Sequence, residues 1–123
     1  MTDFSTASAK DYFPYIEPNN FDGWLVQIES HLEGKGCHFC LRKEGRPKPP
    51  VDEENVPIRQ TPAQANALKD LQELWDDQNR VAFNELMRAC RPNVEAKRLS
   101  ESLPKDKRVA TYLLERLAER LKN

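Results

Sequence analysis

The chain has 123 residues and a mass of 14.3 kDa, a size that suits one domain with a single buried core. Its 19 basic and 20 acidic residues leave a formal net charge of -1, which is not the overall field of a nucleic-acid-binding protein. Only four glycines occur against nine prolines, whereas a βαβ protein or a β-sandwich usually uses more glycine in its turns. The composition therefore favours helices.

The cysteine count and the hydropathy pattern predict an intracellular, cytoplasmic setting. Three cysteines are an odd number, and no basic segment followed by an apolar run opens the chain, so a secreted disulfide scaffold is not expected. No apolar run approaches the roughly 20 residues that span a bilayer. No membrane partner is therefore expected.

Residues 1–18 are predicted to form an N-terminal arm. Residues 1–10 are small and polar, and we expect them to be mobile. Tyr12, Phe13, Tyr15 and Ile16 then gather around Pro14, which favours an extended path. We expect these apolar side chains to pack the arm against a helical core rather than to bind a peptide.

The first predicted helix begins at Asn19 or Asn20, because either side-chain amide can cap it. The apolar residues that follow at helical spacing are Phe21, Trp24, Leu25, Ile28 and Leu32. Gly34 and Gly36 end the pattern, since glycine adopts the left-handed conformation at a helix end without a Cβ clash. The short apolar stretch 37–41 predicts either one turn of helix or a brief strand.

Residues 42–60 predict a long irregular loop. Its prolines are Pro47, Pro49, Pro50 and Pro57. Proline removes backbone donors and fixes φ, so neither a regular helix nor a central strand is expected here. Because loops of this length are unusual inside a compact domain, we expect this one to be functional or mobile.

The clearest local signal is Thr61-Pro62-Ala63-Gln64, a capping box with proline at the first helical position. The apolar face of the helix that follows is predicted to hold Leu68, Leu71, Trp75, Ala82 and Leu86, with Leu74 beside it. Asp76, Asp77, Asn79 and Arg80 are expected mostly on the opposite face. Pro92 closes the segment, which at 1.5 Å per residue would run about 43 Å, so a bend or break is expected.

Two further helices complete the predicted fold. Residues 94–103 form a short helix with Val94, Leu99 and Leu103 inward, and the last helix runs from about Asp106 to Lys122. The apolar face of the last helix comprises Val109, Tyr112, Leu113, Leu117 and Leu121. The prediction is an all-α fold: a small bundle of about four helices over residues 19–123, with an extended N-terminal arm and the long Pro-rich loop 42–60.

His31, Cys37, His38 and Cys40 are the candidate metal ligands, because Cys37 and Cys40 form a C-x-x-C pair. A closed zinc site usually brings a second ligand pair, and the sequence offers none, so packing is the expected role of the cysteines and no metal or cofactor is predicted. A Cys–His nucleophile would lack a third orienting group, and no Gly-rich phosphate loop occurs. We therefore predict no enzyme activity and no small-molecule substrate.

Two basic clusters are candidate contact patches. They comprise Arg42, Lys43, Arg46 and Lys48 in the loop and Lys105, Lys107 and Arg108 before the last helix. Each cluster has the charge to contact phosphates. Acidic residues interleave with the basic ones across the chain, which favours solvated surfaces instead.

Asn20-Phe21-x-x-Trp24, with the apolar stripe after it and the Lys35-Gly36 turn, resembles the N-[YF]-x-x-W opening of copia-type LTR retrotransposon Gag polyproteins. Trp75, Asn79 and Ala82 lie approximately in the register of that family's next Trp and Asn-x-x-Ala. The segment 110–117 is similar to the family's A-x-x-x-W-x-x-L helix, with Tyr or Leu where Trp is usual. The resemblance covers residues 16–122 and is to the N-terminal capsid region.

The resemblance implies a capsid-type domain that self-associates or modulates Gag particle assembly, either as part of a Gag chain or as a short Gag-derived protein. Its partners would be itself or other Gag chains, and RNA contacts would lie mostly outside this region. The matched positions are core positions, so they imply packing and not a site. Two alternatives stay open: a monomeric helical adaptor that binds a partner's helix or peptide in a groove, and a nucleic-acid or zinc-binding module.

Overall fold

The computed structural model describes residues 12–122, and the prediction that residues 1–10 are mobile lies outside this range. The four α-helices of this range are α2 (Phe21–Gly34), α3 (Pro62–Cys90), α4 (Val94–Ser102) and α5 (Ala110–Leu121). Short 3-10 turns occur at η1 (Pro18–Asn20), η2 (Phe39–Leu41) and η3 (Lys105–Lys107). Within residues 12–122 the β-pairing is one isolated bridge between Val51 and Pro57, so the all-α prediction is confirmed.

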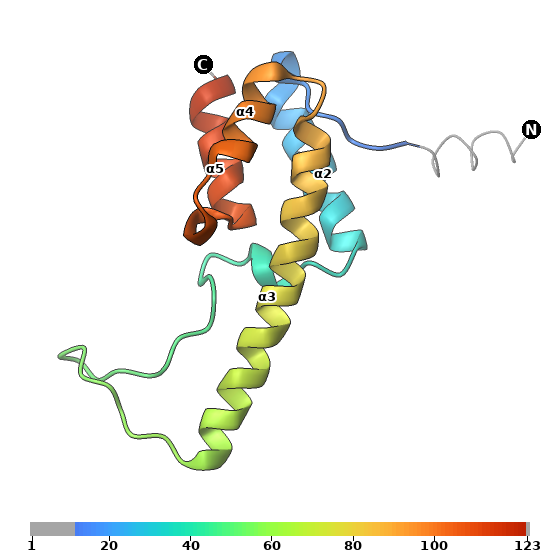
Figure 1. The fold of residues 1–123 in the computed structure, drawn as a ribbon. Coiled ribbons are helices and arrows are strands. Elements are labelled where there is room, and N and C mark those ends of the chain that lie inside the picture. Colours follow the sequence, from blue (N-terminus) through green and yellow to red (C-terminus); the bar gives the residue numbers. More distant parts are fainter. Residues whose placement is uncertain (1–11, 123) are drawn as a thin grey trace, which may run out of the picture.

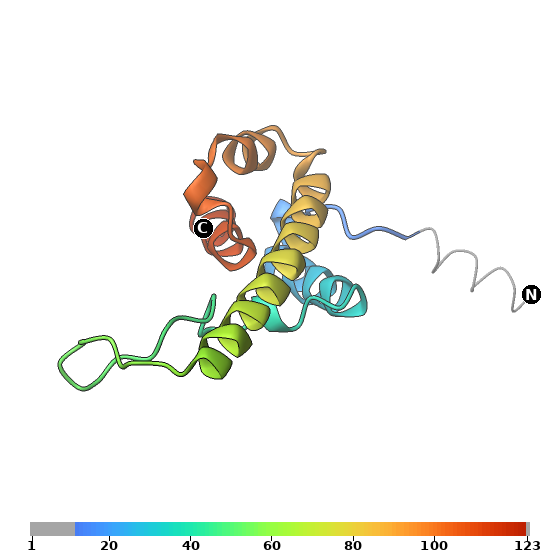
Figure 2. The ribbon, with the colours of Figure 1, turned by 60° about the horizontal axis from the view of Figure 1, so that its bottom comes forward.

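The helices are arranged around the C-terminal half of α3. Figures 1 and 2 show α2 on one side of this half and α4 and α5 on the other, while the first half of α3 and the loop before it project from the body. No helix among residues 12–122 is long and apolar enough to cross a bilayer.

The start and end of α2 follow from local chemistry. The helix is preceded by the turn η1, and the side chain of Asn20 makes no capping hydrogen bond, so the predicted amide cap is absent. At the other end, Gly36 has φ +82° and donates its N–H to the Glu33 carbonyl at 3.0 Å, and Cys37 donates to the Leu32 carbonyl at 3.0 Å. These two bonds form a Schellman motif, which requires the left-handed residue that glycine supplies.

The capping box of α3 is present as predicted. The Thr61 hydroxyl accepts from the Gln64 N–H at 3.1 Å, and the Gln64 side chain accepts from the Thr61 N–H at 2.9 Å. The helix then runs for 29 residues without the break expected from its length. Its interior contains no second proline, which would remove a hydrogen bond from the helical ladder, and no glycine, whose backbone freedom disfavours helix.

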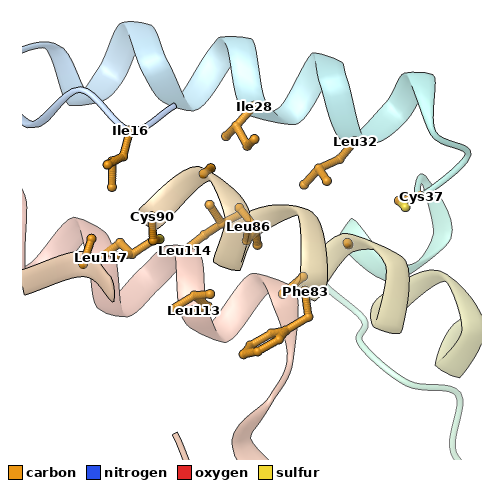
Figure 3. Close-up of a cluster of buried hydrophobic side chains, with 14 of the residues drawn as sticks. Ile16, Ile28, Leu32, Cys37, Phe83, Leu86, Cys90, Leu113, Leu114 and Leu117 are labelled. Carbon is orange, nitrogen blue, oxygen red and sulfur yellow. The ribbon is translucent and has the colours of Figure 1, made fainter. Parts of the chain in front are cut away.

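One hydrophobic core joins all four helices and the arm. Figure 3 shows Ile28 and Leu32 of α2 on one side of Leu86 in α3, with Leu113 and Leu117 of α5 on the other side. The predicted core residues that are buried are Phe21, Trp24, Ile28, Leu32, Trp75, Leu86, Leu113 and Leu117. Leu25 and Val109 are half-buried and pack against this core, and Leu68 is half-buried.

The arm packs on the body through residues that follow Tyr12. Phe13 and Ile16 are buried, whereas Tyr12 and Tyr15 stay exposed. The Ile16 N–H donates to the Ala89 carbonyl at 2.9 Å, and the Trp24 indole N–H donates to the Pro14 carbonyl at 2.8 Å. Phe13 and Ile16 therefore pack the arm against the core as predicted, whereas Tyr12 and Tyr15 do not.

Three further predictions about the helices are wrong. Leu71 and Leu74 are 47% and 48% exposed, although Trp75, the residue that follows Leu74, is buried. Val94 is 66% exposed: α4 buries Ala96 and Ser100, and Val94 is rotated about 200° from Ala96 on the helix. The last helix begins four residues later than expected, since the segment before it forms the turn η3 and then an extended residue, Val109.

Candidate interaction surface

Gln78 of α3 attaches the segment that follows α2. Its side-chain oxygen accepts hydrogen bonds from the backbone N–H groups of Phe39 at 2.8 Å and Cys40 at 3.2 Å. Its backbone carbonyl accepts a weak bond from the Cys37 thiol at 3.6 Å. A single polar residue on the long helix thus holds the η2 turn in place.

The loop that follows η2 is held by two residues of α3 that precede Gln78. The Arg46 guanidinium donates to both carboxylate oxygens of Asp76, at 2.8 and 3.0 Å. The Gln72 amide donates to the Pro47 carbonyl at 2.9 Å. The ion pair is about half exposed, so its net contribution to stability is roughly 0–1 kcal/mol. Its main effect is to fix the position of Arg46 on α3.

A groove of about 840 Å³ lies between this segment and α3. Phe39, Leu41 and Leu71 give it an apolar floor. The predicted loop cluster lines it with Arg42, Lys43, Arg46 and Lys48, against one acidic residue, Glu44. We call it the basic groove; Leu71, which was expected in the core, is part of its floor.

Residues 51–58 form an ordered turn at the far end of the loop, which we call the acidic tip. The Asp52 carboxylate accepts from the N–H groups of Glu54 at 2.8 Å and Val56 at 2.9 Å, and the Asp52 N–H donates to the Val56 carbonyl at 2.9 Å. Asn55 adopts a left-handed φ of 65°, as turns of this kind require. The apolar side chains that the tip exposes are Val51, Val56 and Ile58.

The second basic cluster lies at the start of α5. Lys105, Lys107 and Arg108 are all exposed. The Lys107 ammonium lies 5.5 Å from the centre of the Tyr112 ring, and the Arg108 guanidinium donates to the Leu103 carbonyl at 3.4 Å. Two of the three charges are thus engaged in contacts within this segment and with α5.

Of the candidate metal ligands, Cys37 and Cys40 lie together, since the Cys40 thiol donates to the Cys37 carbonyl at 3.5 Å. His31 lies 2.6 Å from the Glu85 carboxylate and links α2 to α3, His38 is exposed, and the Cys37 and Cys40 side chains are buried. Within residues 12–122 no group of three or more His, Cys, Asp or Glu side chains is close enough to hold a metal ion.

The thiols are neutral at physiological pH. Burial raises the pKa of Cys40 to about 12 and the pKa of Cys90 to about 12, and burial is also the main cause that raises the pKa of Cys37. Thiolates are the nucleophilic and metal-binding form of cysteine, so these residues are unreactive in the folded chain. Their burial agrees with the packing role predicted for them.

Sequence reasoning missed the role of Asn79, which was expected on the polar face of α3. Its amide donates to the Arg108 carbonyl at 2.9 Å, and its side-chain oxygen accepts from the Ala110 N–H at 2.8 Å. Three residues on, Ala82 is fully buried. Of the two residues in the Asn-x-x-Ala pattern, Ala82 thus lies in the core, and Asn79 is half-buried and joins α3 to the start of α5 by hydrogen bonds.

Comparison of the chain with protein families, with curated proteins and with solved structures found no match. Ten large apolar side chains are exposed among residues 12–122, and five of them lie on the acidic tip and the first half of α3. Exposed apolar side chains on the tip and on α3 are candidate protein–protein contact surfaces.

Proposed function

We propose that this chain is a non-enzymatic helical assembly domain that self-associates, of the capsid type implied by its resemblance to copia-type Gag proteins. The observation that carries the proposal is the projecting end of the molecule. There Leu71, Leu74 and the tip side chains expose apolar surface on elements that stand clear of the core.

The exposure of the first part of α3 supports this proposal. An isolated helix shorter than about 12–15 residues is marginal in water, and packing normally supplies its stability. The residues of α3 before Trp75 are nearly all exposed, and they are held by the capping box and the loop contacts rather than by the core. A second protein surface on this helix would cover Leu71 and Leu74.

The test is sedimentation of the full chain over a wide concentration range. We expect the wild-type chain to shift to larger species as its concentration rises, and the double substitution Leu71→Ser/Leu74→Ser to weaken that shift. Because both side chains are about half exposed, folding stability should change by only about 0.5 kcal/mol per site. Val26→Ser on α2, where Val26 is 68% exposed, is the matched control and should behave as wild type.

A monomeric adaptor is the second candidate, and the basic groove favours it. Its volume lies within the ~300–1,000 Å³ typical of sites that enclose small ligands, so it has room for a few side chains of a peptide. A chain that stays monomeric at every concentration and forms no particles would contradict the assembly proposal and support the adaptor.

A further inference from the structure

The basic residues that line the basic groove outnumber the acidic residues that line it or pair with them. Arg46 is paired with Asp76, and Glu44 offsets one of the three remaining cations, Arg42, Lys43 and Lys48, which leaves a net excess of two positive charges in the lining. These charges surround an apolar floor. The groove therefore suits an occupant that combines negative charge with small apolar side chains.

The acidic tip has the reverse properties. Glu53 and Glu54 are exposed beside the apolar side chains of the tip, while the Asp52 carboxylate is used to hold the turn. The turn is also closed by a bond of 3.0 Å from the Ile58 N–H to the Pro50 carbonyl. Because the tip is already ordered, binding it would cost little conformational entropy.

The tip does not reach the groove of its own chain. Only Pro49 and Pro50 separate Lys48, which lines the groove, from Val51, which begins the tip. Two prolines keep φ fixed and favour an extended path, so the chain does not reverse between them. Figures 1 and 2 both show the loop leading away from the body.

We propose that the acidic tip of one copy binds in the basic groove of a second copy. The proposal rests on the self-association inferred above and names its two surfaces. Opposite charges would steer the surfaces together, while Val51, Val56 and Ile58 cover the floor at Leu41 and Leu71. A contact between two different surfaces continues from copy to copy unless its rotation closes a ring, which suits an assembly domain.

Reciprocal charge reversal tests the contact. The groove variant is Arg42→Glu/Lys43→Glu and the tip variant is Glu53→Lys/Glu54→Lys, each made in the full chain. We expect each variant alone to self-associate at least about tenfold more weakly than wild type, because like charges then face each other. An equimolar mixture of the two should recover association, since each reversed surface then meets its complement.

The matched control reverses two adjacent basic residues away from the groove, Lys97→Glu/Arg98→Glu on α4. It should associate as wild type. Wild-type association should also weaken markedly between about 50 mM and 500 mM salt, because exposed charges more than a Debye length apart are screened. Circular dichroism should show every variant folded, and recovery in the mixture is itself a result that misfolded chains do not give.

The outcomes separate this contact from self-association in general. Groove and tip variants that each associate as strongly as wild type would overturn the tip-in-groove contact and leave the assembly proposal standing. Loss in each variant without recovery in the mixture would likewise overturn the pairing. A wild-type chain that never leaves the monomer would overturn both proposals.

Discussion

Replacing Asn79 with alanine should destabilise the fold from a position that looks like an ordinary polar site on α3. The N-cap residue of α5 is Val109, whose side chain has no acceptor for the free N–H groups of the first turn. Asn79 supplies that acceptor from another helix, and it also binds the carbonyl of Arg108 just before the helix. Two hydrogen bonds would be lost together.

The expected loss of stability follows from the burial of Ala110. Ala110 is fully buried, so its N–H would have no solvent in place of the lost acceptor. An unsatisfied buried donor costs about 1–3 kcal/mol, and loss of a helix cap typically costs about 1 kcal/mol. These describe largely the same bond, so they are not added, and we expect the free energy of unfolding to fall by about 1–3 kcal/mol.

Urea unfolding followed by circular dichroism measures the change. Asn79→Asp is the matched control, because it keeps the oxygen that accepts from Ala110 and places a negative charge near the N-terminus of α5, where the helix dipole favours it. It should retain most of the wild-type stability. An alanine variant within about 0.5 kcal/mol of wild type, or an aspartate variant as unstable as alanine, would refute the cap.

Two further predictions concern the core. Trp24 is fully buried and its indole is hydrogen-bonded, so Trp24→Ala should lower the free energy of unfolding by roughly 3–5 kcal/mol in urea, and near-wild-type stability would contradict its central place. Burial raises the pKa of Cys90 to about 12 from an ordinary 9.0, so above pH 9 the unfolded chain loses a proton that the folded chain keeps. Between pH 9 and about 12, this thiol alone should lower the free energy of unfolding by about 1.4 kcal/mol per pH unit. The decrease should therefore be less steep in Cys90→Ala. Equal slopes in the two proteins would show that Cys90 does not contribute.

Local patterns were enough to predict much of the fold. The capping box at Thr61 and the left-handed Gly36 act on their own neighbours, so their roles can be inferred without knowing the rest of the chain. The apolar stripe of α2 was likewise predicted, because a period of 3.6 residues puts its members on one side of any helix.

The contacts that hold the helices together could not be inferred in this way. Asn79 caps a helix that begins 31 residues later, Gln78 holds a turn 38 and 39 residues earlier, and His31 meets Glu85 across 54 residues. Each depends on which segment the fold brings near, and hydrophobic spacing along one helix carries no information about that.

Leu71 shows the limit of periodicity most clearly. Its spacing from Trp75 puts both residues on one broad face of α3, yet Trp75 is 4% exposed and Leu71 is 47% exposed. Periodicity tells which side of a helix is apolar, and burial requires that another element cover that side. The rest of the chain covers Trp75 but leaves Leu71 about half exposed. The proposed contact with a second copy depends on this difference, because it uses the apolar surface that remains open at Leu71.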